Sequence, residues 1–451
     1  MKKLLFQSFL YLCRAGPCYY IGMNILSITA QKPHSTGSGT YLTELVRAFD
    51  RMGHKQAVVC GIYLDDSVEF PDGVGCYPVF FTEKHEADLL AAPCKAPATR
   101  FDALPFPIVG MSDIMPYEST RYRDLTPEMI SRFEDAFIGT DGKAGAVARA
   151  VEDLDPDLII CHHLFLLTAL VRKHFPERRI IGISHGTDLR QMVNCDNLRE
   201  LVRPCIAKLD MTLALHEEQR AQIKELFGTD DPKVAVIGSG YNDSLFNTEG
   251  RTERKPGEPV RICYAGKISR PKGVPEMLKA LAAIAGDNSV PPFELTMAGG
   301  CQDDVLKDSL AELPDYVTWL GQIPQPSLAE LLRRTDIFVL PSYFEGLPLV
   351  LIEAMASGAV PVSTDLPGVR PWINANVGRP NVIYADMPEM KSIDEPTDAG
   401  RDAFTIALSA VLKDTIRGFE SGALPGALPD TSAITWDGVA RRLLTIAASD
   451  I

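Results

Sequence analysis

The sequence predicts an α/β protein made of two Rossmann-like domains, each a doubly wound parallel sheet, that face each other across a cleft. Short β-branched or aromatic runs recur along the whole chain, and amphipathic helical stretches such as residues 40–53 and 274–286 separate them. This repeated alternation is typical of parallel sheets. A polar, turn-rich stretch, residues 246–259, divides the chain into halves and reads as a linker. With 451 residues, 46% of them hydrophobic, the chain can form two domains with their own cores.

The predicted strands assign residues 23–245 to an N-terminal domain and residues 260–432 to a C-terminal domain. Residues 433–451 are expected to form a final helix that packs back across the domains. Residues 82–127 are rich in proline and longer than a simple connection, so we expect a lid or part of a substrate wall there. The predicted strands are NILSIT, QAVVCGI, DLIIC, RIIGIS, MTLAL and KVAVIG in the first half, then VRICYAG, FELTMAG, YVTWLG, DIFVLP and AVPVST.

Residues 1–22 form an N-terminal extension that mimics a signal peptide, with two lysines before a short apolar stretch. The natural first strand, MNILSITA, begins only at Met23. We interpret the extension as an upstream-start artefact or a loose tail, with a membrane-contacting segment as the alternative. A second apolar run, residues 158–171, contains two histidines and is too short to span a bilayer.

The net charge restricts the classes of binding partner, and the cysteine content bears on the cellular compartment. A formal net charge of -14 argues against nucleic acid and anionic membranes as general partners, leaving at most peripheral membrane contact. The ten cysteines contain no C-x-x-C pair, which indicates reduced, mostly buried thiols in a cytoplasmic protein, at most peripheral to the inner membrane face. Asp303 and Asp304 fit a helix start better than a metal site. We expect no metal and no cofactor.

The segment from residue 336 to 362 places a carboxylate inside an apolar helix. A buried strand, DIFVLP, is followed by Pro348, which suits the first helical position, and by Gly358, which suits a left-handed cap. The helix between them is apolar all round except for Glu353, which must find hydrogen-bond donors. An internal ion pair is the commoner solution. Glu345, in the loop before the helix, favours ligand hydroxyls instead, because open α/β sheets bind ligands at such strand–loop–helix junctions.

Three further segments follow predicted strands. Lys267, Arg270 and Lys272 lie directly after one, so they form either a solvated loop or a cluster that neutralises a diphosphate. Gly37 and Gly39 precede a helix; as a dinucleotide fingerprint they are incomplete, and by themselves such glycines more often make only a turn. His185 stands beside Gly at another strand end, where a structural role and a ligand contact are about equally expected.

Four segments resemble those of a known family and occur in the same order along the chain. FEGLPLVLIEAMASGAVPV resembles the E-(seven residues)-E signature of retaining nucleotide-sugar glycosyltransferases of the GT-B fold, in family four. AGKISRPKGV is similar to its G-R-L-x-x-x-K-G segment, GSGTYLTEL to its glycine-rich first loop, and SHGTD to its H-G-x-D segment. The similarity runs from about Met23 to Gly378.

The resemblance implies roles for the donor side. Lys267, in place of the usual arginine, and Lys272 would hold the donor diphosphate, assisted by the amides of Gly346 and Leu347. Glu353 would accept hydrogen bonds from the ribose hydroxyls.

It also implies the remaining contacts. Glu345 and His185 would act at the donor sugar, and with Lys267 they are the expected catalytic residues. Ile323 would lie beside the base. Gly37 and Gly39 would form the acceptor-side loop.

The reaction implied is transfer of a hexose from a nucleoside-diphosphate sugar, with a UDP-sugar expected, and with retention of anomeric configuration. The partners are this donor and an unidentified acceptor, which can be a glycan, a lipid or a small molecule. A GT-B nucleotide-sugar epimerase and a non-catalytic sugar-nucleotide-binding protein are the alternatives. One departure bears on the donor sugar: Pro371 and Trp372 stand about where the family usually has a Pro-Glu.

Overall fold

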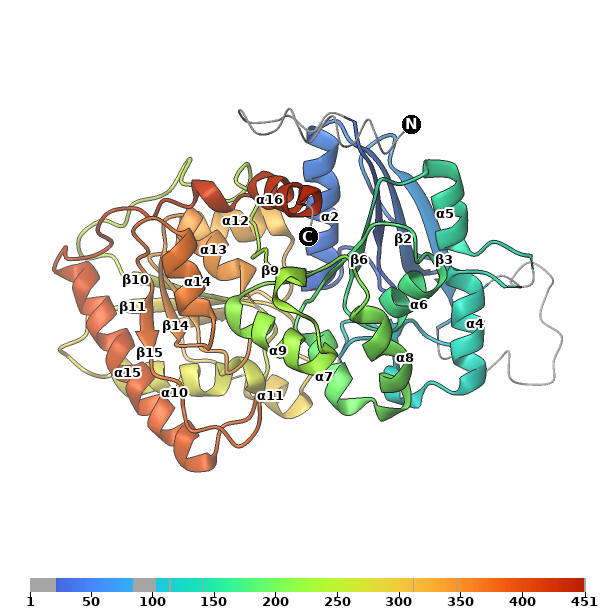
Figure 1. Ribbon diagram of the computed structural model, residues 1–451. Helices are drawn as coiled ribbons and strands as arrows, with labels where there is room; N and C mark the ends of the chain where they lie inside the picture. The colour runs from blue at the N-terminus through green and yellow to red at the C-terminus, as the bar shows by residue number, and fades with distance from the viewer. Residues whose placement is uncertain are drawn as a thin grey trace. The chain divides into compact units, whose positions relative to one another are not determined.

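The computed structural model describes residues 22–83, 103–112, 115–140, 142–310, 312–345 and 347–449. The chain divides into two compact units (Figure 1), one of Met1–Gly238 with Trp436–Ile451 and one of Ser239–Thr435. Each unit contains one large parallel sheet flanked by helices, so the predicted class of two Rossmann-like α/β domains is confirmed. The division follows Gly238, and the stretch expected to be a linker, residues 246–259, belongs to the second unit.

The sheet of the first unit has the order β3-β2-β1-β6-β7-β8-β9. The strand order reverses between β1 and β6, so the loops that follow these two strands flank a topological switch point. The strands are β1 Asn24–Ile28, β2 Lys55–Tyr63, β3 Gly75–Phe81, β6 Leu158–His162, β7 Ile180–Ile183, β8 Met211–Ala214 and β9 Val234–Val236, with a separate pair β4 Val109–Gly110 and β5 Thr120–Arg121. The helices are α2 Gly37–Arg51, α4 Pro127–Phe137, α5 Ala146–Leu154, α6 Leu166–His174, α7 Thr187–Asn194, α8 Asp196–Ile206, α9 Glu217–Phe227 and α16 Trp436–Ala448, with 3-10 turns η2 Tyr122–Asp124 and η3 Asp231–Lys233.

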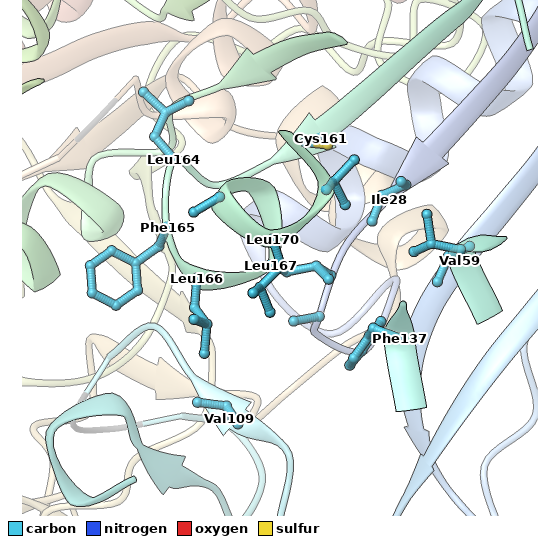
Figure 2. Packing of buried hydrophobic residues seen from close by; sticks show 14 of the residues in the cluster. Ile28, Val59, Val109, Phe137, Cys161, Leu164, Phe165, Leu166, Leu167 and Leu170 are labelled. Atoms are coloured by element: carbon cyan, nitrogen blue, oxygen red, sulfur yellow. The ribbon is translucent and has the colours of Figure 1, made fainter. Parts of the chain in front are cut away.

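The core of the first unit lies between this sheet and its covering helices. Figure 2 shows Leu167 and Leu170 of α6 in the same cluster as Ile28 of β1 and Val59 of β2. The described part of the segment expected to be a lid or part of a substrate wall joins the same core through buried apolar side chains, which are Leu104, Phe106, Ile108, Val109, Met111 and Tyr122. Their burial ties this part to the body of the unit and does not fit a lid, whereas the substrate wall stays a prediction.

The C-terminal helix α16 spans the predicted residues and packs on α2 in the first unit (Figure 1). The ring of Trp436 meets that of Tyr41 edge to face, with centroids 4.8 Å apart. Arg442 donates to the carbonyl of Ile237, 2.9 Å away. The contacts of α16 inside the first unit therefore join this helix to α2.

The sheet of the second unit has the order β12-β11-β10-β13-β14-β15, with its switch point between β10 and β13. The strands are β10 Val260–Ala265, β11 Phe293–Ala298, β12 Val317–Trp319, β13 Ile337–Leu340, β14 Val360–Thr364 and β15 Ile383–Ala385. The helices are α10 Val274–Ala285, α11 Asp304–Ser309, α12 Gln325–Arg333, α13 Leu349–Ala356, α14 Val369–Asn376 and α15 Asp398–Glu420, with 3-10 turns η4 Arg270–Lys272 and η5 Ser432–Ile434.

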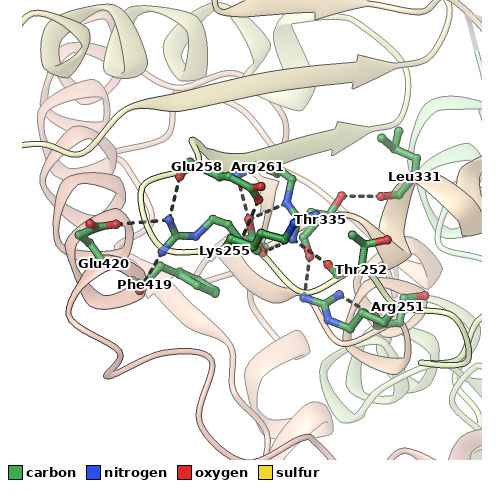
Figure 3. Close-up of polar contacts among 12 residues, drawn as sticks. Arg251, Thr252, Lys255, Glu258, Arg261, Leu331, Thr335, Phe419 and Glu420 are labelled. Carbon is green, nitrogen blue, oxygen red and sulfur yellow. Dashed lines mark hydrogen bonds and ion pairs between the residues drawn. The ribbon is translucent and has the colours of Figure 1, made fainter.

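The stretch expected to be a linker is fastened to the second unit by arginines (Figure 3). Arg251 donates to the carbonyls of Ser357 and Thr335, each 2.9 Å away. Arg261, at the start of β10, donates to the carbonyl of Thr252 in this stretch, 2.9 Å away. It also forms a two-pronged ion pair with the buried Asp336, with nitrogen–oxygen distances of 2.9 and 2.7 Å. These charge-assisted bonds keep the segment attached to the sheet that carries the candidate site.

Every predicted strand is present in the structure. The strands β3, β4, β5 and β15 were not predicted. The runs of β3 and β15 contain glycine, proline or half-exposed positions that weaken the alternating pattern, and β4 and β5 have only two residues each. Asp303 caps α11 by accepting from the amide of Leu306, as expected for a helix start. Within the described ranges, no helix has both the length and the apolar character required to cross a membrane.

Candidate functional site

The candidate site in the second unit lies at the switch point between β10 and β13. The loop after β10 carries Lys267, and the loop after β13 carries Glu345. Because neighbouring parallel strands end at the same edge of a sheet, residues far apart in sequence meet there. The topology thus brings together two segments that the sequence had singled out separately.

Backbone packing holds these two loops against each other. Gly273, at the end of η4, has a positive φ of 63°, and a Cβ atom at this position would lie 2.1 Å from the carbonyl oxygen of Pro341. Only glycine permits that approach. The amide of Tyr343 donates to the carbonyl of Pro271, 3.0 Å away. The loop that carries Lys272 is therefore fixed beside the loop that carries Glu345.

The ammonium of Lys272 and the carboxylate of Glu345 form an ion pair, with Nζ 2.6 Å from Oε1. The hydroxyl of Ser342, which is fully buried, donates to the same oxygen at 2.7 Å. The two charged side chains retain 28% and 16% of their exposure, so both stay within reach of a ligand. Sequence reasoning missed Ser342; its position directly after the buried strand is the signal that could have indicated it.

Lys267 is the second cation at this edge. Its backbone carbonyl accepts a hydrogen bond from the hydroxyl of Tyr264, 2.7 Å away, which fixes the start of the loop. Burial lowers the pKa of Lys267, and the neighbouring charge of Lys272 lowers it further. Two close cations favour a bound anion, because an anion relieves the repulsion between them.

Arg270, the third cation of this loop, is directed to another partner. Its Nε lies 3.3 Å from Oδ2 of Asp303, and its side chain is 58% exposed. This contact joins the loop after β10 to the start of α11. The cation cluster is thus reduced to Lys267 and Lys272, the pair that the family resemblance had selected.

Glu353 is buried, with 8% of its surface exposed, in the middle of α13. Pro348 is the N-cap residue of this helix rather than its first helical residue, and Gly358 follows the C-cap with a positive φ of 87°. Leu347, just before the helix, is buried as well. Gly346 lies outside the described residues. The unusual buried carboxylate predicted from the sequence is therefore present in the helix that follows the loop of Glu345.

Ile323 lies between β12 and α12 and is half-buried. The turn before it contains Gly321, with a positive φ of 68°. The amide of Gly299 donates to the carbonyl of Gly321, 2.7 Å away, and the indole of Trp319 donates to the carbonyl of Gly299 at 2.8 Å. These bonds tie the Ile323 loop to the end of β11, at the same edge of the sheet.

Gly37 and Gly39 lie in the first unit, at the start of α2 and after β1. A Cβ atom at Gly39 would lie 2.9 Å from the carbonyl oxygen of Lys32, whereas Gly37 has open space. The amide of Gly39 donates to the hydroxyl of the N-cap residue Thr36, 3.1 Å away. At Gly39 the need for glycine comes from the chain's own loop, which packs on the helix start.

His185 lies after β7 in a cluster of histidines that sequence reasoning did not assemble. Its Nε2 is 3.1 Å from Nδ1 of His162, and the ring of His163 lies 4.8 Å away, centroid to centroid. Burial lowers the pKa of all three imidazoles, that of His163 to about 3. The cluster is therefore neutral near pH 7. The adjacent histidines after the strand DLIIC were its sequence signal.

Among the residues that the structure describes, no group of three or more histidine, cysteine, aspartate or glutamate side chains is arranged to hold a metal ion. The polar groups at the edge of the second sheet are instead two lysines and a carboxylate.

Two family models match the chain. One described as glycosyl transferases group 1 matches residues 246–391, and one described as glycosyl transferase 4-like domain matches residues 36–240. The chain belongs to the GT-B glycosyltransferases of family four. Within this family assignment, the first model covers the second unit's candidate site, and the second covers the histidine cluster.

Curated relatives and solved structures agree with this family. The chain is 28% identical over 178 residues to a D-inositol 3-phosphate glycosyltransferase of Nocardia farcinica, a match that covers 36% of this chain and 39% of that protein. The matches to curated relatives span about half of those proteins' lengths, between 39% and 58%.

The fold of this glycosyltransferase is similar to that of solved structures. Sucrose-phosphate synthase from Thermosynechococcus elongatus has a TM-score of 0.60 at 16% identity, over 94% of this chain and 98% of that one. HepE from Anabaena, solved in complex with UDP and glucose, has a TM-score of 0.54 at 14% identity, over 94% and 98%. At these identities the likeness shows the fold.

The departure from the family pattern lies in α14. Pro371 and Trp372 are both in the first turn and a half of this helix, and Trp372 is 5% exposed. The buried side chain of Trp372 therefore lies about where the family usually has the glutamate of its Pro-Glu pair.

Proposed function

We propose that the chain transfers a hexose from a nucleoside-diphosphate sugar, with a UDP-sugar as donor, to an acceptor with retention of the anomeric configuration. The observation that carries the proposal is the arrangement at the β10–β13 edge. Lys267 and the Lys272–Glu345 pair supply cations for a diphosphate and a carboxylate for a sugar at one place.

The donor diphosphate binds beside the two lysines. A phosphate oxygen replaces the carboxylate of Glu345 as the partner of Lys272, and Lys267 contributes a second positive charge. The ribose hydroxyls donate to Glu353, which follows in α13. The position of Glu353, a buried carboxylate in the helix directly after the loop of Glu345, supports this role.

The chemical step breaks the bond between the anomeric carbon and the donor phosphate oxygen, the acceptor oxygen forms the new bond on the same face, and the acceptor's hydroxyl proton passes to the departing phosphate. Negative charge develops on the departing nucleoside diphosphate. Lys267 and Lys272 stabilise this charge, together with the N-terminus of α13, and the side chains suffice without a metal ion. Glu345, released from Lys272, acts at the sugar. No covalent nucleophile is assigned.

Several finer features belong to the proposal. UDP is favoured because HepE, a protein of the same fold, was solved with UDP and glucose. The acceptor is a glycan, a lipid or a small molecule. A cytoplasmic location is supported by the free cysteines of the described residues, which include the exposed Cys76. The homologues are glycosyltransferases, so neither the epimerase nor the non-catalytic binding protein is favoured.

The test begins with binding. Calorimetric titration with UDP, ADP and GDP should select UDP, and a thermal-shift screen of UDP-sugars should select the donor. Incubation of that donor with candidate acceptors, followed by NMR of the product's anomeric proton, then reports the configuration. Absence of binding to every nucleoside diphosphate would reject the proposal. Rearrangement of the donor without any acceptor would support the epimerase instead.

A further inference from the structure

The histidine pair of the first unit is built on two adjacent strands. His162 is the last residue of β6, is 4% exposed, and pairs in register with Ile183 at the end of β7. His185 follows two residues later. The two ring planes are nearly parallel, with an interplanar angle of 10° and a centroid distance of 5.3 Å, and Nδ1 of His162 lies 3.1 Å from Nε2 of His185. This geometry is a hydrogen bond between imidazoles.

Asp188 fixes the backbone on both sides of the pair. Its Oδ2 accepts from the amide of Leu164, 2.7 Å away in the loop after β6. Its Oδ1 accepts from the amide of His185 at 3.1 Å and from the hydroxyl of Ser184 at 3.0 Å. Asp188 is fully buried. The two loops are therefore held together independently of the imidazoles, so the pair's geometry does not depend on its own hydrogen bond.

The position of the proton in this bond follows from the surroundings. Both imidazoles are neutral near pH 7, because burial lowers the pKa of each well below its usual range. A neutral imidazole carries one N–H. Among the described residues, Nε2 of His162 has no hydrogen-bond partner.

Two arrangements of the proton can be compared. If His162 carries its proton on Nε2, it buries an N–H that no described protein group accepts. If it carries the proton on Nδ1, the N–H donates to His185 and only a lone pair stays without a protein partner. Buried N–H donors without acceptors are rarer than incompletely used acceptors. The second arrangement is favoured.

We propose that His162 is a positioning residue that donates from its Nδ1–H to Nε2 of His185 and so holds His185 as the Nδ1–H tautomer. The hydrogen bond made by one ring nitrogen determines which nitrogen carries the proton. His185 then offers an N–H donor, from Nδ1, to a ligand oxygen. Its consequence for catalysis rests on the proposed function and on the family resemblance, which implies that His185 acts at the donor sugar.

The tautomer can be read without any ligand. The full chain is labelled with 15N-histidine, and long-range 1H–15N correlation spectra are recorded near pH 7.5, with His185 identified by its loss in His185→Asn. The expected pattern for His185 is the Nδ1–H tautomer, the reverse of the preference of free imidazole side chains. An Nε2–H pattern for His185 in the native chain would overturn the proposal.

Two variants at position 162 test whether the N–H donor must lie at the position of Nδ1. Asparagine at position 162 places an amide N–H near the position of Nδ1, whereas glutamine places it near that of Nε2. His162→Asn should therefore keep His185 as Nδ1–H, and His162→Gln should return it to the Nε2–H form. His54→Gln, at another buried histidine, is the control and should leave the His185 signals unchanged. Equal tautomers in the two position-162 variants would contradict the proposal.

A second measurement tests the catalytic consequence. With UDP-glucose as the probe, His162→Gln should lower kcat by about tenfold, the effect of one hydrogen bond, while UDP affinity stays as in the native chain. His162→Asn should recover most of that loss. If the native chain turns over no UDP-sugar, the proposed function fails while the tautomer result still decides the role of His162. Equal kcat in native chain and His162→Gln would remove that role.

Discussion

Lys272 and Glu345 share an ion pair of 2.6 Å, and the hydroxyl of Ser342 donates to the same carboxylate oxygen. The positive charge that would bind a diphosphate is thus already balanced by the carboxylate that would act at the sugar. A diphosphate binding at Lys272 must compete with Glu345 for the ammonium. Binding would then release the carboxylate at the moment the donor arrives, which links the roles of the two residues.

Glu345→Gln should separate binding from turnover. Removing the carboxylate charge frees Lys272, so UDP should bind with unchanged or somewhat higher affinity. Turnover of the donor should fall by about 10²-fold, the scale for loss of a positioned transition-state group. Calorimetric titration with UDP and a product assay measure the two effects. Glu294→Gln, at an exposed carboxylate of β11, is the matched control. Weaker UDP binding in Glu345→Gln would contradict the competition described above.

Glu353→Gln should weaken UDP itself. Charge-assisted hydrogen bonds contribute roughly 1.5–3 kcal/mol each, so a loss of about tenfold or more in affinity is expected. The melting temperature of the unliganded chain should change little if Glu353 binds ribose. A large drop in melting temperature that UDP cannot rescue would show instead that Glu353 has a structural role.

The affinity for UDP should depend on pH through Lys267. Because burial and Lys272 lower its pKa, Lys267 loses its charge at a lower pH than an ordinary lysine. UDP affinity should therefore be constant at lower pH and fall as the pH rises through this lowered pKa. Lys267→Arg should move the fall to higher pH, since arginine stays charged throughout. Titrations across the alkaline range check this, and identical profiles for the two proteins would refute the assignment.

Asp188→Asn should destabilise the first unit. The carboxylate accepts hydrogen bonds from two backbone amides and a buried hydroxyl, and an amide side chain would turn an NH2 group toward one of those donors. We expect a loss of about 2–4 kcal/mol in the free energy of unfolding. Asp437→Asn, which breaks the partly exposed pair with Arg51, should cost only about 0–1 kcal/mol. Urea unfolding of both variants compares them.

Removal of divalent metal should not abolish turnover. The proposal assigns the charge on the leaving group to Lys267 and Lys272 and requires no metal ion. Activity measured after treatment with excess EDTA should equal that of untreated protein. Full loss with EDTA, restored by magnesium or manganese, would show that the lysines are not sufficient.

Much of the second unit's edge could be predicted from sequence, because its signals are local. The strand before Glu345, the proline and glycine at the ends of α13 and the burial of Glu353 each depend on neighbouring residues. The roles of those residues stay predictions, since affinity and turnover measure them. The extension of residues 1–22 stays a prediction too, because residues 1–21 lie outside those described.

The packing of residues 104–111 could not be predicted from the sequence. Proline-rich irregular sequence carries no periodic signal, so its buried side chains, among them Phe106 and Ile108, could not be told from exposed ones. The attachment of residues 246–259 to the second unit could not be predicted from the sequence either. A polar segment looks the same in a free linker and in one whose arginines, such as Arg251, bind backbone carbonyls.

The sequence by itself determined the α/β class, most of the strands and the residues of interest, because hydrophobic periodicity and the requirements of glycine and proline act over a few residues. Only the tertiary structure decided which of these residues meet. Lys272 and Glu345 are 73 residues apart and His162 and His185 are 23 apart, and each pair meets because parallel strands bring their C-terminal ends to one edge of a sheet. Strand order and loop packing set those distances, and neither can be read from a local pattern.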